Sequence, residues 1–197
     1  MPPDFEKQGY WHARFEMEKS FEWLVPSHVF MAILDPYLQK QARSARLLHL
    51  GFGTSNLQTH LRSAGFENVT NVDYEPLAIE HGRQHEEDAF GDVRMRYLVA
   101  DATQLDLPDR YDVVIDKCAA DAISCSGDEA VLAIAAAIDK CLADGGIWIS
   151  LSYSAVRYQL KDLACDVEVV DKIPTPKQRE NDPEIYYYCY LLRPRWS

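Results

Sequence analysis

From Arg46 onward, short apolar runs alternate along the chain with longer segments of helical pattern. The apolar runs cover residues 47–50, 69–72, 97–100, 113–115 and 147–151. Runs of that length are typical of strands that are buried on both faces of a parallel sheet. The segments between them cover residues 54–65, 75–88 and 127–146. Alternating strands and helices predict a doubly wound α/β fold.

The three helical segments carry recognisable start and stop signals. The first opens on the capping residue Thr54 and stops at Gly65. The second has Pro76 near its start, where a missing N–H costs little. The third is the strongest helical pattern in the chain, and we expect it to end at Gly145 and Gly146.

The C-terminal part of the chain has a different pattern. Residues 165–173 and 184–194 are both strand-like, and the polar segment 174–184 between them contains X-Pro turns. Two strands without an intervening helix form an antiparallel hairpin. We therefore expect a Rossmann-like, mostly parallel, seven-stranded sheet with a C-terminal antiparallel hairpin. The last strand places Tyr186, Tyr188 and Tyr190 on one face, as core residues, with an end member as a candidate for lining a substrate pocket.

The N-terminal segment is rich in aromatic residues and precedes the first predicted strand. Its aromatic residues include Tyr10, Trp11, Phe15, Phe21, Trp23 and Phe30. We interpret residues 1–45 as a helical or irregular layer and residues 46–197 as the Rossmann-like core. A length of 197 residues predicts that both parts belong to a single domain, 1–197.

Composition and charge narrow the function classes. The 31 acidic and 20 basic residues give a net charge of −11, which repels phosphate backbones and argues against nucleic-acid binding. Such a surface suits a basic partner or a cationic ligand, and it also serves solubility. No apolar run is long enough for a membrane span, and no secretory leader is recognisable. Five cysteines without a C-x-x-C pair indicate reduced thiols in a cytoplasmic protein.

No metal site is expected, and the oligomeric state is left open. His81 and His85 are four residues apart on a predicted helix and could touch one metal ion. No further ligands accompany them, so we interpret the two histidines as part of a solvated helix face.

The candidate ligand-binding residues follow the ends of the predicted strands. This is the expected place for them, because ligands of open α/β sheets bind beyond the carboxyl ends of the strands. Gly51 and Gly53 follow the first strand and allow a tight turn with close backbone approach. Asp73 follows the second strand, 20 residues after Gly53, an offset that suits a grip on ribose hydroxyls. Tyr74 comes next and could lie against an adenine face. The pattern therefore predicts a nucleoside site.

Two further acids follow the third and fourth strands. Asp101 precedes Ala102, and Asp116 precedes Lys117. An aspartate after a strand is often only a helix N-cap, and that alternative stays open for Asp101. A nicotinamide enzyme usually needs a second domain for its substrate, and the predicted sheet uses nearly all of the chain. A nucleoside with a short charged tail, such as S-adenosylmethionine, fits better.

Several motifs then resemble one family. They are "YWHARF" at 10–15, Glu22-Trp23, "GFGTS" at 51–55, "NVTNVDYEPLAIE", "ADATQLDLPDRYDVVIDK" and the tyrosine-rich last strand. In these motifs the chain resembles the class I, seven-β-strand S-adenosylmethionine-dependent methyltransferases, and most of all the branch with lysine methyltransferases of translation elongation factor 1-alpha. The resemblance implies cofactor contacts at Trp11, Phe15, Trp23, Gly51, Gly53, Asp73, Tyr74, Asp101, Ala102 and Asp116.

One loop departs from that branch. The branch usually has D-K-G-T-L-D-A after the fourth strand, and this chain has "DKCAADA" at 116–122. In the fold that the resemblance implies, this loop faces the transferred methyl group, so the changes fall where the acceptor sits. Asp116 and Asp121 are the candidates for orienting an ammonium or relaying its proton, with Lys117 tying the loop. For Asp121 a helix-cap or loop hydrogen bond is the alternative.

The function that we predict from the sequence is methyl transfer to a lysine amine of a protein, and two alternatives remain open. The family branch and the acidic surface favour methyl transfer to a lysine amine of a protein. The short chain and the altered loop favour a small-molecule N-, O- or S-methyltransferase of specialised metabolism. The second alternative is a cofactor-binding partner subunit without turnover.

Overall fold

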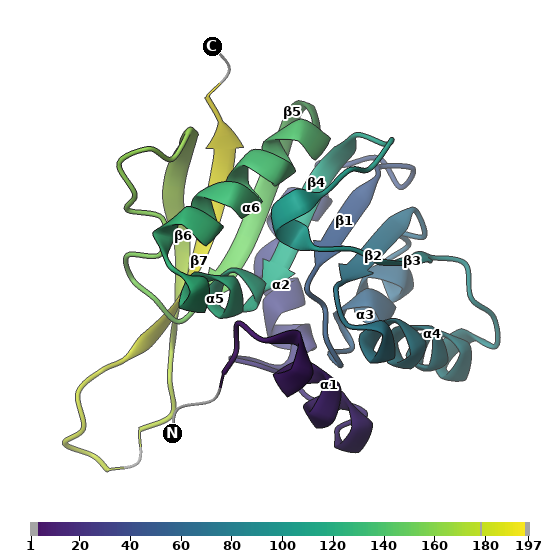
Figure 1. The fold of residues 1–197 in the computed structure, drawn as a ribbon, viewed down its shortest axis with the longest axis horizontal. Coiled ribbons are helices and arrows are strands. Elements are labelled where there is room, and N and C mark those ends of the chain that lie inside the picture. The colour runs from purple at the N-terminus through teal and green to yellow at the C-terminus, as the bar shows by residue number, and fades with distance from the viewer. Residues whose placement is uncertain (1–3, 178, 196–197) are drawn as a thin grey trace.

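The computed structural model describes residues 4–177 and 179–195, and their core is a single seven-stranded sheet with helices on both faces (Figure 1). The strands are β1 (Leu47–Leu50), β2 (Val69–Asp73), β3 (Arg96–Val99), β4 (Tyr111–Lys117), β5 (Leu142–Ser152), β6 (Cys165–Pro174) and β7 (Tyr186–Pro194). The helices are α1 (Gln8–Met17), α2 (Ser27–Leu38), α3 (Leu57–Ser63), α4 (Pro76–Phe90), α5 (Ala119–Ile123) and α6 (Asp128–Cys141). Short 3₁₀ turns follow at Ala102–Gln104 and Ser124–Ser126.

The strand order is β3-β2-β1-β4-β5-β7-β6. β1 pairs in parallel with β2 and β4, β2 with β3, and β4 with β5. β7 is antiparallel to β5 and to β6, so the C-terminal hairpin closes the sheet as predicted. The Rossmann-like, mostly parallel fold expected from the hydropathy pattern is confirmed.

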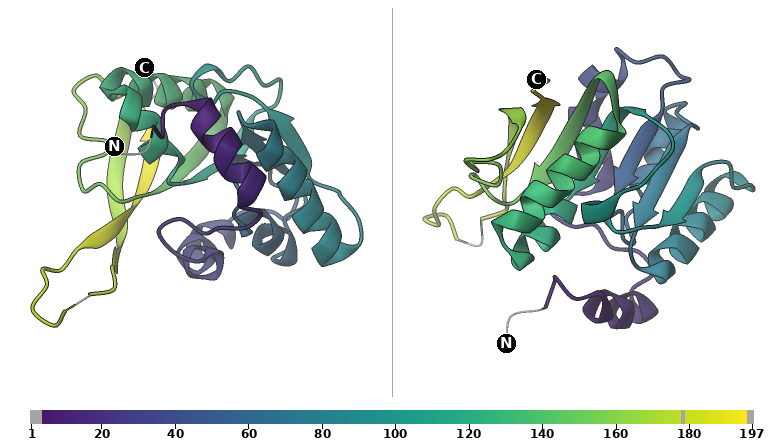
Figure 2. Two further views of the ribbon diagram at one scale, coloured as in Figure 1. Left: turned by 60° about the horizontal axis from the view of Figure 1, so that its bottom comes forward. Right: turned by 45° about the horizontal axis from the view of Figure 1, so that its top comes forward.

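Strand residues alternate between two hydrophobic cores. Leu47, Val113 and Ile115 point to the face that α2, α3 and α4 cover. Leu48 and Val114 point to the opposite face, which α6 covers. The two layers lie on either side of the sheet in both views of Figure 2. Burial on both faces explains why these strands consist of apolar runs without alternation.

Several element ends differ from the sequence-based expectation. α3 begins at Leu57 rather than at Thr54, and its first N–H bonds to the Ser55 hydroxyl at 3.2 Å. α6 ends at Cys141, before the two glycines, because Leu142 already pairs with Tyr111 of β4.

β3 also differs, because it was expected to be buried on both faces. It covers Arg96–Val99 rather than 97–100 and lies at one edge of the sheet. Val99 is consequently 56% exposed.

The N-terminal layer lies partly beyond the sheet. α2 packs on the sheet and contributes Phe30, Leu34 and Leu38 to the core on the face that α2, α3 and α4 cover. α1 lies beyond the strand ends, as Figure 1 and the right view of Figure 2 show. It is tied to the start of α4, where His12 Nδ1 and Glu75 Oε1 are 2.9 Å apart and Gln8 donates to the Tyr74 carbonyl at 2.7 Å.

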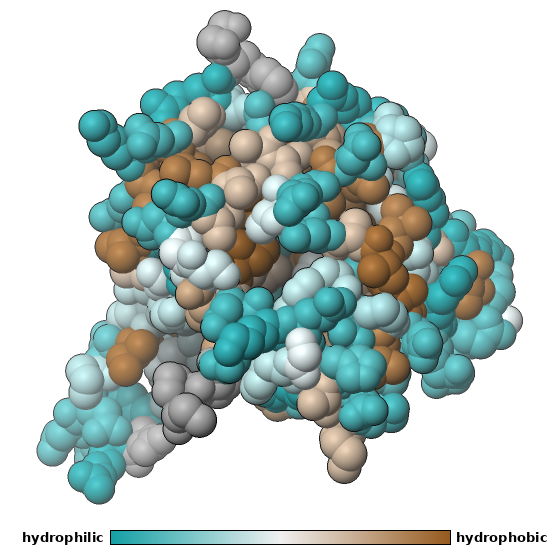
Figure 3. Space-filling model, in the orientation of Figure 1, coloured by the Kyte–Doolittle hydropathy of each residue, from teal (hydrophilic) through white to brown (hydrophobic). Residues whose placement is uncertain are grey.

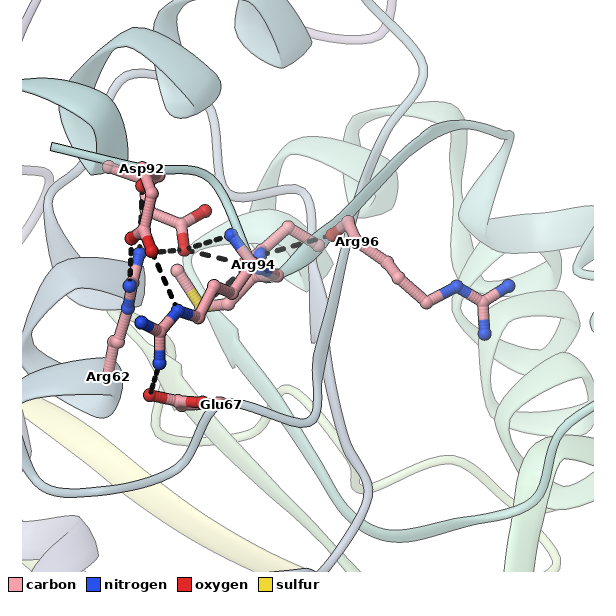
Figure 4. A network of polar contacts seen from close by, with 8 residues as sticks. Arg62, Glu67, Asp92, Arg94 and Arg96 are labelled. Atoms are coloured by element: carbon pink, nitrogen blue, oxygen red, sulfur yellow. Dashed lines mark hydrogen bonds and ion pairs between the residues drawn. The ribbon is translucent and has the colours of Figure 1, made fainter. Parts of the chain in front are cut away.

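A polar network fastens the segment between α4 and β3 (Figure 4). Arg62 of α3 donates to the buried Glu86 of α4 at 2.6 Å and also pairs with Asp92. Arg94 joins Asp92 at 2.8 Å and Glu67 at 3.0 Å. Because Glu86 also accepts from the Arg94 and Met95 backbone N–H groups, this carboxylate sets the entry into β3.

The face of the molecule seen in Figure 3 is mixed rather than divided into large apolar and polar regions. On the face shown in Figure 3, apolar residues are scattered among hydrophilic ones, and the tip of the β6–β7 hairpin is mostly hydrophilic. Within the described residues, none of the helices combines the length and hydropathy needed to cross a bilayer.

Candidate functional site

A cavity of about 610 Å³ opens at the carboxyl ends of the parallel strands. Its walls come from four parts of the chain: the N-terminal layer, the turn after β1, the ends of β2 to β4, and the segment from α5 to α6. The volume falls within the range of ordinary small-molecule sites. Position and size therefore agree with the ligand site expected at the switch point of such a sheet.

The turn after β1 needs its glycines. Gly51 and Gly53 both have φ near +55°, in the left-handed region that glycine adopts most easily. A Cβ on Gly51 would lie 2.5 Å from Ala119 Cβ, so a side chain at 51 would collide with α5. The Gly53 N–H donates to Asp73 Oδ2 at 2.9 Å. The turn thus packs tightly and also orients an acid of the site.

Asp73 is the best-positioned acceptor for a ligand diol. Its carboxylate accepts from the Gly53 and Glu75 N–H groups, lines the cavity and is 5% exposed. A carboxylate has about four lone-pair sites, so two bonds leave capacity for hydroxyl donors. Burial raises the pKa of Asp73 to about 6, against the backbone hydrogen bonds that favour the charged form.

Tyr74, Asp101 and Ala102 line the neighbouring wall. Asp101 Oδ1 accepts from the Thr103 N–H at 2.8 Å and from its hydroxyl at 2.7 Å, so it caps the following 3₁₀ turn. The N-cap alternative for Asp101 is therefore correct, and the residue faces the cavity as well. An aromatic ring beside small apolar groups suits the faces of a purine base.

An aromatic cluster from the N-terminal layer covers the cavity. Trp11 lies 5.5 Å from Phe15 and 6.0 Å from Trp23 between ring centroids, and all three rings line the cavity. The Phe15 carbonyl accepts from His81 Nε2 at 2.9 Å, which fixes α1 to α4. The sequence pattern assigns His81 to a solvated helix face. In the structure His81 instead contacts α1 through this hydrogen bond.

Asp116 lies behind the cavity wall. Its side chain is fully buried, accepts from Trp148 Nε1 at 2.8 Å and from the Ala120 N–H at 3.1 Å, and is absent from the lining. Burial raises its pKa to about 6. These contacts favour a structural role for Asp116, in which it joins β4, β5 and α5. Because Asp116 does not line the cavity, its position does not support the predicted cofactor contact or catalytic role.

Asp121 lines the cavity, but its carboxylate is occupied by its own chain. Oδ1 accepts from the Ser152 hydroxyl and from Arg157 Nε, the latter at 2.9 Å. Oδ2 accepts from the Tyr153 N–H at 2.9 Å. This pattern matches the loop-bond alternative for Asp121 and ties α5 to the end of β5.

Some lining residues had no signal in the sequence analysis. They include Phe5, Leu24, Ile123, Cys125, Ser126 and Tyr153. Cys118 was noted for its place in the loop, and it adopts φ +70° at the start of α5. Burial raises the pKa of the Cys118 thiol well above its usual range. The thiol is therefore neutral near pH 7 and serves as a small wall residue.

Two other expectations concern the last strand and metals. Tyr188 and Tyr190 pack in the core on the α6 side of the sheet. None of Tyr186, Tyr188 and Tyr190 lines the cavity. Residues 4–177 and 179–195 contain no group of three or more His, Cys, Asp and Glu side chains suited to a metal ion. The cavity chemistry thus consists of a diol acceptor, a purine-sized apolar wall and a glycine turn, which together fit a nucleoside ligand.

Comparisons with known proteins agree with this site. Residues 48–150 match the family described as "Methyltransferase domain". The chain is 60% identical to "Methyltransferase srdJ" of Neurospora crassa, over 98% of this chain and 85% of that protein. It is 28% identical to "EEF1A lysine methyltransferase 4" of Mus musculus, over 81% of this chain and 66% of that protein. It spans only 18–22% of the longer eEF1A lysine and N-terminal methyltransferases and their homologues that it matches.

A solved structure shows the same fold with a ligand. The N-methyltransferase NodS of Bradyrhizobium japonicum, in complex with S-adenosylhomocysteine, has a TM-score of 0.68 and covers 92% of this chain and 97% of its own. The sequence identity is 14%, so the likeness concerns the fold.

Proposed function

Because this chain belongs to the S-adenosylmethionine-dependent methyltransferases, we propose that it methylates a small, largely apolar acceptor molecule bound in the cavity. The cofactor of the family is S-adenosylmethionine, whose sulfonium supplies an electrophilic methyl group. The cavity wall that contains Asp73, Tyr74 and Ala102 fits the nucleoside part of S-adenosylmethionine. Asp73 would hold the ribose hydroxyls, and Tyr74 and Ala102 would border the adenine.

The acceptor end of the cavity is the part lined by the loop after β4, the segment after α5 and the end of β5. Its lining residues are Cys118, Ala122, Ile123, Cys125, Ser126 and Tyr153, together with Asp121. The six residues other than Asp121 are uncharged. The Asp121 carboxylate is paired with Arg157, whose side chain is only 11% exposed. This pairing carries the proposal, because a lysine ammonium would find the Asp121 carboxylate already neutralised, which leaves Glu6, close enough to raise the pKa of Cys125, as the other carboxylate on this part of the lining.

The protein residues act by alignment and by excluding water. The Trp11, Phe15 and Trp23 rings cover the cavity and keep solvent from the reacting atoms. Holding two reactants in line is worth roughly 7–11 kcal/mol of the barrier, so a strong protein base is not required. With Asp121 engaged and Cys118 neutral, the acceptor attacks without a protein base, and the proton of the methylated product passes to solvent when the product leaves the cavity.

Methyl transfer to a protein lysine is the second candidate. It is supported by the names of the eEF1A lysine methyltransferases at 27–29% identity and by the net charge of −11, which suits a basic protein partner. The five free cysteines favour a reducing compartment such as the cytoplasm for either acceptor.

Methyl-labelled S-adenosylmethionine and a fractionated lysate of the source cells distinguish these functions. We expect label in the small-molecule fraction, with the Asp73→Ala variant as the background control. Label confined to the protein fraction would overturn the small acceptor and favour lysine. Cofactor binding without label in either fraction would indicate the partner subunit without turnover.

A further inference from the structure

The segment from Phe21 to Val25 contains a strained turn at the edge of the cavity. The Val25 N–H donates to the Trp23 carbonyl at 2.7 Å, closing a three-residue turn, and Leu24 at its centre has φ +62°. Three-residue turns with a positive central φ are rare and strained, and leucine rarely adopts this conformation. Trp23 and Leu24 both line the cavity. The strain therefore lies in the residues that shape the site.

The ammonium group of Lys117 bridges the two ends of this turn. Lys117 Nζ donates to Glu22 Oε2, just before the turn, and to the Val25 carbonyl at its end, the latter at 3.2 Å. Lys117 stands at the end of β4, has a side chain only 3% exposed and lines the cavity. One rigid strand end thus holds both sides of a turn from the N-terminal layer.

Glu22 joins the same turn to the glycine turn after β1. Its Oε1 accepts from the Ser27 hydroxyl at 2.6 Å and from the Asn56 N–H at 3.1 Å. The Phe21 N–H adds a bond to the Thr54 carbonyl at 3.2 Å. Burial opposes the charge on Glu22, but the bonds from Lys117 and Ser27 outweigh it and lower the pKa of Glu22. Glu22 is therefore ionised near pH 7, whereas burial lowers the pKa of Lys117 against the opposing effect of the Glu22 carboxylate.

We propose that Lys117 is a positioning residue for the cofactor, which clamps the strained turn at 23–25 so that Trp23 and Leu24 form a wall of the cofactor site. Strained backbone persists only where its surroundings over-determine it, and the contacts of Lys117 and Glu22 supply that constraint. Without the clamp the turn relaxes to negative φ, and both side chains leave the positions that complete the site. Lys117 would act on the cofactor site in this way whichever acceptor is methylated.

A set of variants separates positioning from a purely structural ion pair, with S-adenosylhomocysteine as the probe in calorimetry. Lys117→Met leaves Glu22 as an unpaired, half-buried charge, so we expect lower stability as well as weaker binding. The double variant Glu22→Gln/Lys117→Met leaves no unpaired charge, and we expect it to unfold in urea close to wild type. Its affinity should still be reduced by about tenfold or more. Lys140→Met, which removes an exposed lysine of α6, should match wild type in both measurements.

Recovery of full affinity in the double variant would overturn the proposal, because the pair would then be structural only. Hydrogen exchange on the wild-type protein gives a second test if the variants do not fold. We expect the amides of Val25 and Asn56 to exchange at least about tenfold more slowly when S-adenosylhomocysteine is bound. Unchanged exchange at both amides would show that the turn is not coupled to the cofactor, which contradicts the proposal.

Discussion

At the scale of single residues, the site depends on how each acid is used. Asp73 keeps acceptor capacity toward the cavity, whereas Asp101 also caps a turn. Asp116 and Asp121 hold the end of β4 and the start of α5 in place. The sequence could indicate that these acids follow strands, because carboxyl ends of parallel strands share one edge. It could not indicate which of them point into the cavity, since that depends on partners such as Trp148 and Arg157.

The raised pKa of Asp73 predicts a pH-dependent affinity. The ionised carboxylate accepts the ligand hydroxyls, and its pKa is about 6 in the ligand-free protein. Affinity for S-adenosylhomocysteine should therefore be full above pH 7 and fall as the pH drops through 6, by up to about tenfold per unit. Calorimetry from pH 5 to pH 8 measures this, and Asp73→Asn should bind weakly with a flatter profile. A wild-type affinity that is constant over this range would contradict the assignment.

The same raised pKa has the opposite effect on the stability of the ligand-free protein. A buried carboxylate whose pKa is raised contributes stability that is present below its ordinary pKa of 3.8 and is lost as the pH rises through about 6. Asp116 contributes in the same direction.

Asp121 is predicted to be structural. Asp121→Asn breaks the pair with Arg157 and should lower the free energy of unfolding by about 3 kcal/mol, measured in urea. Asp144→Asn serves as the control, and it should have little effect because Asp144 is exposed near the start of β5. Wild-type stability together with lost methyl transfer would instead make Asp121 a catalytic residue.

At the scale of elements, the hydropathy pattern identified the five parallel strands and the hairpin because burial on both faces leaves a strong apolar signal. The ends of helices and strands were harder to predict from the sequence. The helix α6 ends early because Leu142 pairs with Tyr111, a contact between residues 31 positions apart. The strained turn at Leu24 has no local signal, because positive φ is usually marked by glycine or asparagine. Lys117 and Glu22 are 95 positions apart, and no spacing connects them.

The packing of α4 gives a prediction at this scale. A Cβ on Gly82 would lie 2.6 Å from a Phe52 ring atom and 2.8 Å from a Tyr97 ring atom. Gly82→Ala should therefore destabilise the protein by about 1–3 kcal/mol, although alanine favours helices. Gly9→Ala in α1 meets no atom within 4 Å and should be neutral or stabilising by up to about 1 kcal/mol. Equal urea midpoints for the two variants would contradict this packing.

At the scale of the whole molecule, the cavity connects parts that are distant in sequence. The N-terminal layer, the turn after β1, the strand ends and the α5–α6 segment all line it, so a ligand that fills it joins them. The resemblance of "YWHARF" predicted cofactor contacts at Trp11 and Phe15, and both residues line the cavity. Hydropathy alone would have assigned them to a cover over the sheet.

Binding should therefore stabilise the whole chain. S-adenosylhomocysteine at about 100 times its Kd should raise the free energy of unfolding by about 2.7 kcal/mol. Urea denaturation with and without the ligand measures this. An unchanged midpoint at saturating ligand would show that the ligand does not select the folded state.

The central claim is that the cavity beside Gly53 and Asp73 holds the methyl-donor cofactor. Calorimetry with S-adenosylhomocysteine on wild type, Asp73→Ala and Asp144→Ala tests it most directly. Asp144 is exposed near the start of β5 and does not line the cavity, so its variant removes the same charge away from the cavity. We predict equal binding by wild type and Asp144→Ala and no detectable binding by Asp73→Ala. Wild-type affinity in Asp73→Ala would contradict the placement of the cofactor.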